Sequence, residues 1–145
     1  MIEQKGLLDA LERIVPDTDI WREIRARRVE EAGRRLLLAG DREGALEKFR
    51  TCVKEKKAVF IERWNAAKSK SDAASVAANM RELARNYLGI AILERRAKRF
   101  DATRAACEAA IEILDQTETA TEDEKARDES AAIREEAARL LENCE

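Results

Sequence analysis

The amino-acid sequence predicts an all-α protein, a single domain over residues 1–145 with about six antiparallel helices. Residues that break helices are rare, since proline occurs once and glycine five times. Charged residues make up 40% and apolar residues 45% of the chain, and the composition is dominated by Ala, Glu, Arg and Leu, which favour helices. Apolar residues also recur every three or four positions through long segments. A chain of 145 residues can enclose one ordinary core.

The first helix is expected at residues 2–14, where an apolar face is formed by Leu7, Leu8, Leu11 and Ile14. It should end before Pro16, because the residue preceding a proline is pushed out of the helical region. Residues 17–19, "DTD", offer caps for a second helix over residues 20–39. Gly40 should end that helix, since glycine tolerates the left-handed conformation found at helix ends.

The third helix is expected from its cap Asp41 to residue 68, and one stripe contains Ala45, Leu46, Phe49, Val53, Phe60 and Trp64. The sequence "SKSD" at 69–72 predicts the next break, with Ser71 or Asp72 as the cap. The fourth helix, over residues 73–98, is apolar nearly all round. A helix with this pattern is covered on several sides, so we expect it in the middle of the molecule.

The fifth helix should begin at Phe100 and Asp101, and "QTETA" at 116–120 is expected to be a linker. The sequence "TEDE" at 121–124 matches a capping box that opens a last helix. Residues 1–115 carry a net charge of +4 and residues 116–145 a net charge of −6. The acidic last helix is therefore either a fixed cap on a basic body or a releasable partner-binding element, and we favour the cap.

The composition excludes several kinds of chemistry. The chain has no histidine, so Ser–His and Cys–His nucleophile pairs and histidine-containing zinc sites cannot form within it. Its three cysteines are widely spaced and form no Cys-x-x-Cys motif, which indicates reduced thiols in a cytoplasmic protein. The N-terminus does not match a secretory signal, and no apolar run is long enough to span a membrane. We expect no enzyme activity, no cofactor, no metal and no membrane insertion.

Residues 34–50, "RRLLLAGDREGALEKFR", form two helical patterns separated by a tight turn. With Gly33 before it, this hairpin resembles a tetratricopeptide repeat, in which small residues lie where two antiparallel helices cross. The resemblance implies that Gly33 and Ala45 meet at the crossing, that Gly40 makes the turn, and that Phe49 fills the space beyond.

A weaker second copy covers residues 86–114, with Gly89 as its crossing residue. The interval from Gly89 to Thr103 is two residues longer than in the first copy, and Thr103 replaces the usual alanine. We therefore expect hairpins at 18–68 and 72–116 and an acidic capping helix at 121–144. A generic long-helix bundle is the alternative fold. Residues 28–55 also look like part of a microtubule-interacting-and-transport domain, although three further helices argue against that family.

The repeat resemblance implies a groove, lined by the first helix of each hairpin, that holds a peptide or helix of another protein. The candidate groove residues are Arg27, Glu30, Arg34, Leu37, Asn86, Ile90 and Leu93. Arginine offers a fork of donors suited to a carboxylate. The clamp that some repeats use for chaperone tails needs Lys and Asn where this chain has Glu30 and Arg34, so a chaperone partner is not expected. The predicted function is a non-catalytic adaptor or scaffold, with self-association left open.

An RNA-associated helical module is the alternative function. It rests on four basic clusters, at residues 25–28, 54–57, 68–70 and 95–99. A nucleic-acid-binding protein is usually strongly basic, with aromatic residues on the same face. This chain has a net charge of −2, so a nucleic-acid partner is disfavoured.

Overall fold

The structure, a computed structural model, describes residues 18–120, 123–142 and 144. These residues form an all-α fold of five α-helices and one 3-10 turn, with no strand among them. The helices are α2 (Asp19–Leu38), α3 (Arg42–Ala66), α4 (Lys70–Arg96), α5 (Phe100–Thr117) and α6 (Glu124–Leu141), and the 3-10 turn is η1 (Glu118–Ala120). The helix expected at residues 2–14 lies outside the described part of the chain, so five helices stand where about six were predicted.

Two predicted caps are confirmed. The hydroxyl of Thr18 accepts a hydrogen bond from the backbone of Trp21, and the carboxylate of Asp41 accepts one from the backbone of Gly44 at 2.9 Å. The cap predicted for α4 is wrong. Its N-terminal hydrogen bond goes to the hydroxyl of Ser69, 3.0 Å from the backbone nitrogen of Asp72, so the helix starts earlier than expected.

The boundary between α5 and α6 also differs from the prediction. Residues 116–120 are not a loose linker, because α5 continues to Thr117 and η1 follows directly. Thr121, the first residue of the predicted capping box, lies outside the described residues. The described cap of α6 is Asp123, whose carboxylate accepts a hydrogen bond from the backbone of Lys125 at 3.1 Å.

The two hairpin turns have the same geometry. Gly40, between α2 and α3, has φ +88°, and Lys98, between α4 and α5, has φ +62°. In both turns two backbone amides donate to carbonyls of the preceding helix: Gly40 and Asp41 in the first, and Lys98 and Arg99 in the second. Lys98 follows Gly40 by 58 positions and adopts a conformation that costs little only for glycine. The turn of the second hairpin therefore repeats the hydrogen bonding and left-handed residue of the first turn.

The crossing of α2 and α3 lies at Gly33. A Cβ atom there would come within 2.7 Å of the Phe49 ring, and Ala45 on the facing helix is fully buried. Gly89 was expected to mark the second crossing, and this prediction is wrong. A Cβ atom added at Gly89 would meet nothing within 4 Å, so no helix approaches closely there. Counting 58 positions on from Gly33 leads to Ala91, which is fully buried.

With Ala91 in place of Gly89, the interval to Thr103 in the second hairpin is no longer two residues too long. Ala91 precedes Thr103 by 12 positions, as Gly33 precedes Ala45, and the Thr103 side chain is fully buried like that of Ala45. Thr103 satisfies its hydroxyl by donating to the carbonyl of Arg99 at 3.0 Å, so a polar residue is accommodated at the crossing.

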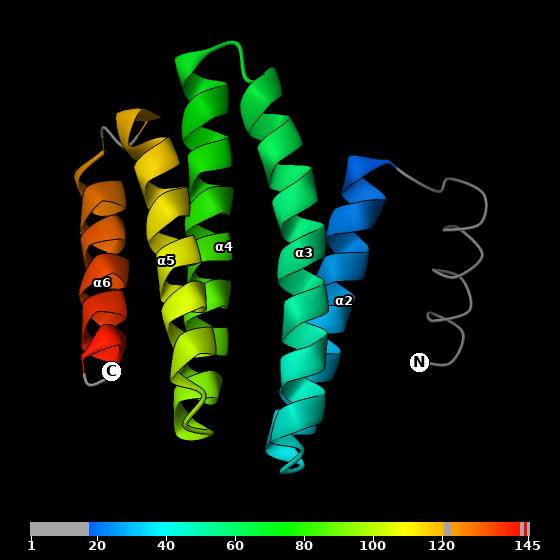
Figure 1. Cartoon of the computed structure of the whole chain (residues 1–145). Coiled ribbons are helices and arrows are strands. Elements are labelled where there is room, and N and C mark those ends of the chain that lie inside the picture. The colour runs from blue at the N-terminus through cyan, green and yellow to red at the C-terminus, as the bar shows by residue number, and fades with distance from the viewer. Residues whose placement is uncertain (1–17, 121–122, 143, 145) are drawn as a thin grey trace.

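The helices form a row, with α4 in the middle as predicted (Figure 1). Each hairpin pairs adjacent helices, α3 packs on α4, and α6 packs on both α5 and α4. The core is aliphatic and small, with Phe60, Met80, Leu83 and Leu114 among its largest fully buried side chains. Ile133, Ala137 and Leu140 of α6 are buried, so the acidic helix lies docked against the body.

Candidate functional site

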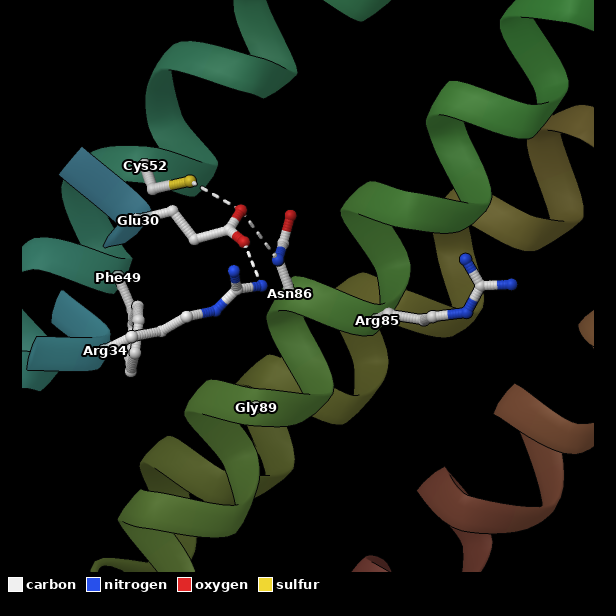
Figure 2. Close-up of a pocket in the computed structure, with 7 residues that line it drawn as sticks. All are labelled: Glu30, Arg34, Phe49, Cys52, Arg85, Asn86 and Gly89. Atoms are coloured by element: carbon white, nitrogen blue, oxygen red, sulfur yellow. Dashed lines mark hydrogen bonds and ion pairs between the residues drawn. The ribbon is translucent and has the colours of Figure 1, made fainter. Parts of the chain in front are cut away.

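A hollow of about 270 Å³ opens between α2, α3 and α4. Figure 2 shows the residues that line it, which are Glu30, Arg34, Phe49, Cys52, Arg85, Asn86 and Gly89. We call this region the α2–α4 hollow. It lies beside the α2–α3 crossing, where Gly33 brings the two helices close together, so the side chains that line it project from helices in close contact.

The floor of the hollow is a buried polar cluster. The Lys56 side chain is fully buried, and its ammonium nitrogen lies 2.5 Å from Glu30 Oε1 and 2.8 Å from Asn86 Oδ1. The amide of Asn86 donates in turn to Glu30, at 3.4 Å. The Cys52 thiol lies 3.7 Å from the same carboxylate oxygen. Three helices thus contribute one side chain or more to a single hydrogen-bonded group.

Glu30 is ionised in this cluster. Burial by itself would raise the pKa of its carboxyl, but the hydrogen bond and charge of Lys56, together with the charge of Arg34, outweigh burial and hold the pKa below its usual value. The buried charges of Lys56 and Glu30 therefore compensate each other, which is the condition under which charged groups are tolerated in a protein interior.

Arg–Glu pairs join α2 to α4 and α4 to α6. Arg27 of α2 donates to Glu82 of α4 at 2.8 Å. On the other side of α4, Arg81 and Arg85 contact Glu129 of α6 at 3.2 and 3.0 Å. The same type of pair thus connects α2 to α4, which both line the hollow, and α4 to α6.

The rim of the hollow carries two guanidinium groups with different orientations. Arg34 reaches over Phe49 toward Glu30, with which it forms an ion pair, yet 61% of its side chain is exposed (Figure 2). Arg85 points away from Glu30 in the same view and pairs with Glu129. Arg34 is therefore the cation that a molecule entering the hollow would meet.

The structure brings together some of the predicted groove residues and separates others. Glu30, Arg34 and Asn86 line the α2–α4 hollow, and Arg27 contacts α4 beside it. Leu37 is 38% exposed and is not part of the lining. Ile90 and Leu93 were expected to face the groove, but both are buried in the hydrophobic core, because the side of α4 that carries them is covered by its neighbours.

Two residues of the cluster were not identified from the sequence. Lys56 was counted in the basic cluster at residues 54–57, and Glu82, whose carboxylate lies 3.6 Å from the Lys56 ammonium, was not singled out. Lys56 falls on the same helical stripe as Ala45, Phe49 and Cys52, and a charge inside an apolar stripe is the signal that could have revealed it.

The thiols of Cys52 and Cys107 show no sign of activation. Burial raises the pKa of Cys52 to about 11, and Cys107 likewise to about 11. A reactive thiol needs the opposite shift, which comes from exposure and nearby cations. Within the described residues, no group of three or more cysteine, aspartate and glutamate side chains is placed to hold a metal ion. No helix in the same part of the chain is both long and apolar enough to cross a bilayer.

Comparisons with known proteins returned no match. No protein-family model matches the chain, no curated protein is significantly similar to it in sequence, and no solved structure resembles it significantly.

Proposed function

We propose that this chain is a non-catalytic interaction module of tetratricopeptide-like hairpins, which holds a peptide or helix of another protein in the α2–α4 hollow. The observation that carries the proposal is the position of Arg34, whose exposed guanidinium stands beside the Phe49 ring above a fixed polar floor. An aromatic surface next to a guanidinium suits a peptide with one apolar and one acidic side chain.

The repeat-like assignment is supported by the backbone. Both hairpins have a left-handed residue at the same place in the turn, and Ala91 and Thr103, which follow Gly33 and Ala45 by 58 positions, are buried as those two residues are. The packing of α6 on α4 and α5 resembles the start of a third hairpin, which is where a capping helix lies in repeat arrays. Three buried free cysteines are in keeping with a reducing compartment such as the cytoplasm.

The alternative, an RNA-associated module, has less support. Several residues of the basic clusters are engaged within the protein: Lys56 is buried, Arg27 pairs with Glu82, and Arg99 pairs with Glu94 and Glu43. These cations are already neutralised and would release few counterions from a nucleic acid.

The test is affinity capture from a lysate of the source cells, with nuclease added, followed by mass spectrometry. Three baits are compared: the unchanged chain, Arg34→Ala, and Arg35→Ala as the matched control. Arg35 is the next residue of α2, is more exposed and pairs only with Glu31 at 3.6 Å in the described structure. We expect a partner that survives nuclease, binds the unchanged chain and the control, and is lost with Arg34→Ala. Equal capture by all three baits would place the binding surface elsewhere, and loss of every partner on nuclease treatment would favour RNA.

A further inference from the structure

A second and larger hollow, of about 610 Å³, lies on another face of α3, and we call it the α3 trench. Its lining comes from α3 except for one residue of α4, and consists of Arg50, Val53, Lys54, Lys57, Ala58, Ile61, Glu62 and Tyr87. The trench shares no lining residue with the α2–α4 hollow. A molecule bound in one site therefore does not have to displace a molecule from the other.

The shape of the trench follows a single helix. Its α3 residues recur at the spacing i, i+3, i+4, i+7, i+8, which places them on one side of the helix, and they cover 12 positions from Arg50 to Glu62. With the rise of an α-helix, this row is about 18 Å long. A long, straight row of this kind matches the side of a second helix lying along α3.

Part of the lining is apolar. Val53 belongs to the hydrophobic core, and Ile61 and Tyr87 pack against that core while remaining partly exposed. Ala58 is exposed, and its short side chain leaves room for a partner to come close to the α3 backbone. Covering this surface removes apolar area from water, which favours a partner that contributes apolar side chains of its own.

The rest of the lining gives the trench an unbalanced positive charge. Lys54 and Lys57 are exposed, and neither forms an ion pair with any residue that the structure describes. Arg50, one turn before Lys54, is 53% exposed, although it is also held in an ion pair within the protein. Glu62 is the acidic residue of the lining, and the guanidinium of Arg22 neutralises it at 2.6 Å. The two lysines are therefore available for carboxylates outside this molecule.

We propose that the α3 trench is a docking site for an acidic amphipathic helix of another protein. The apolar side of that helix covers Ile61 and Tyr87, and carboxylates along its edge pair with Lys54 and Lys57. RNA would also pair with the lysines, but it gains little from the aliphatic side chains of Val53 and Ile61, so the apolar part of the lining favours the helix. This inference does not depend on the proposed function.

The experiment measures the fluorescence anisotropy of two labelled peptides, each about four helical turns long and stapled on the side away from the trench, because free peptides of that length are only marginally helical. Both peptides carry the same leucine stripe, and their edge positions hold glutamate in one and lysine in the other. Four chains are compared, with circular dichroism to verify folding: unchanged, Lys54→Glu/Lys57→Glu, Ala58→Arg, and the control Lys68→Glu/Lys70→Glu. The control makes the same charge change where α4 begins, outside the trench lining.

We expect the unchanged chain and the control to bind the glutamate peptide about tenfold more tightly than the lysine peptide, and added salt to weaken that binding. Lys54→Glu/Lys57→Glu should weaken it by about tenfold or more, because two attractions become repulsions. Ala58→Arg should weaken it by a similar factor for a different reason, since this variant adds positive charge but fills the trench. The two variants together separate docking in the trench from general attraction to a basic surface.

The proposal is overturned if Ala58→Arg binds the glutamate peptide as tightly as the unchanged chain does, if both peptides bind equally, or if neither binds. A uridine oligonucleotide that binds in place of the peptides and is lost with Lys54→Glu/Lys57→Glu would assign the trench to RNA. Self-association that Ala58→Arg removes would assign it to a second copy of this chain. Loss of the glutamate peptide with Arg34→Ala, but not with the trench variants, would place the peptide in the α2–α4 hollow. Since Arg34 is unchanged in the four chains, failure of this proposal leaves the proposed function standing.

Discussion

The ammonium nitrogen of Lys56 on α3 lies 2.5 Å from a carboxylate oxygen of Glu30 on α2, and the lysine side chain is fully buried. Burying such a pair between two helices has a large desolvation cost, because both ions lose their hydration. Its geometry is nevertheless restrictive, since Asn86 of α4 contacts both partners. The cluster therefore sets the relative positions of the three helices that form the α2–α4 hollow.

Replacing Lys56 should be strongly destabilising. Lys56→Met leaves the Glu30 carboxylate without its main counter-charge, and removing one partner of a buried pair costs about 3–5 kcal/mol of unfolding free energy. Urea unfolding measures this loss. Lys48→Met, which changes an exposed lysine of the same helix, should alter the value by no more than about 0.5 kcal/mol. If both variants lose the same amount, Lys56 is not buried in an ion pair.

The Glu30 carboxyl predicts a loss of stability in acid. Burial raises the pKa of this carboxyl, but Lys56 and Arg34 lower it by a larger amount. The pKa in the folded state therefore lies below the ordinary value of 4.5. Its contribution is complete above pH 4.5 and is lost as the pH falls through the lowered folded pKa. The unfolding free energy should therefore decline in that acid range, and less steeply for Glu30→Gln. Asp19, Glu62 and Glu129 also have lowered pKa values, so some decline should remain. Parallel curves for the two chains would contradict the assignment.

The two mid-helix glycines should respond in opposite directions to alanine. At Gly33 the new methyl group would come within 2.7 Å of the Phe49 ring and 3.2 Å of Lys48, so Gly33→Ala should lower the unfolding free energy by about 1–3 kcal/mol. At Gly89 the methyl group has open space, so Gly89→Ala should raise it by about 0.5–1 kcal/mol through helix propensity. Thermal unfolding of the two variants gives the signs, and a gain at Gly33 would show that the helices are not in contact there.

The helices could be predicted because their signals are local. Apolar periodicity and the side-chain caps at Thr18 and Asp41 act within a few residues. The start of α4 was missed because three residues in "SKSD" can cap a helix, and Ser69, the earliest of them, is the one that does. The second crossing was placed at Gly89 because glycine is the usual marker of close approach, whereas the register that selects Ala91 depends on the turn at Lys98.

The candidate site was predicted only in part, because its geometry depends on several helices at once. Glu30, Arg34 and Asn86 were predicted from the groove positions that the repeat resemblance implies on the first helix of each hairpin. The pairing of Lys56 with Glu30 requires that two apolar stripes face each other, each carrying one charge of opposite sign.

The buried thiols predict slow alkylation of the folded chain. Cys52 and Cys107 each have a pKa of about 11, so at pH 8 only about one molecule in a thousand carries either thiolate. With iodoacetamide at pH 8, mass spectrometry should show little labelling of these two cysteines in the native protein and rapid labelling in urea. The native rate should rise with pH well beyond pH 9, since the thiolate fraction grows until the pH reaches the raised pKa. Rapid native labelling of Cys52 would mean that the cluster with Glu30 opens readily, and the α2–α4 hollow would then lack the fixed floor on which the proposed function depends.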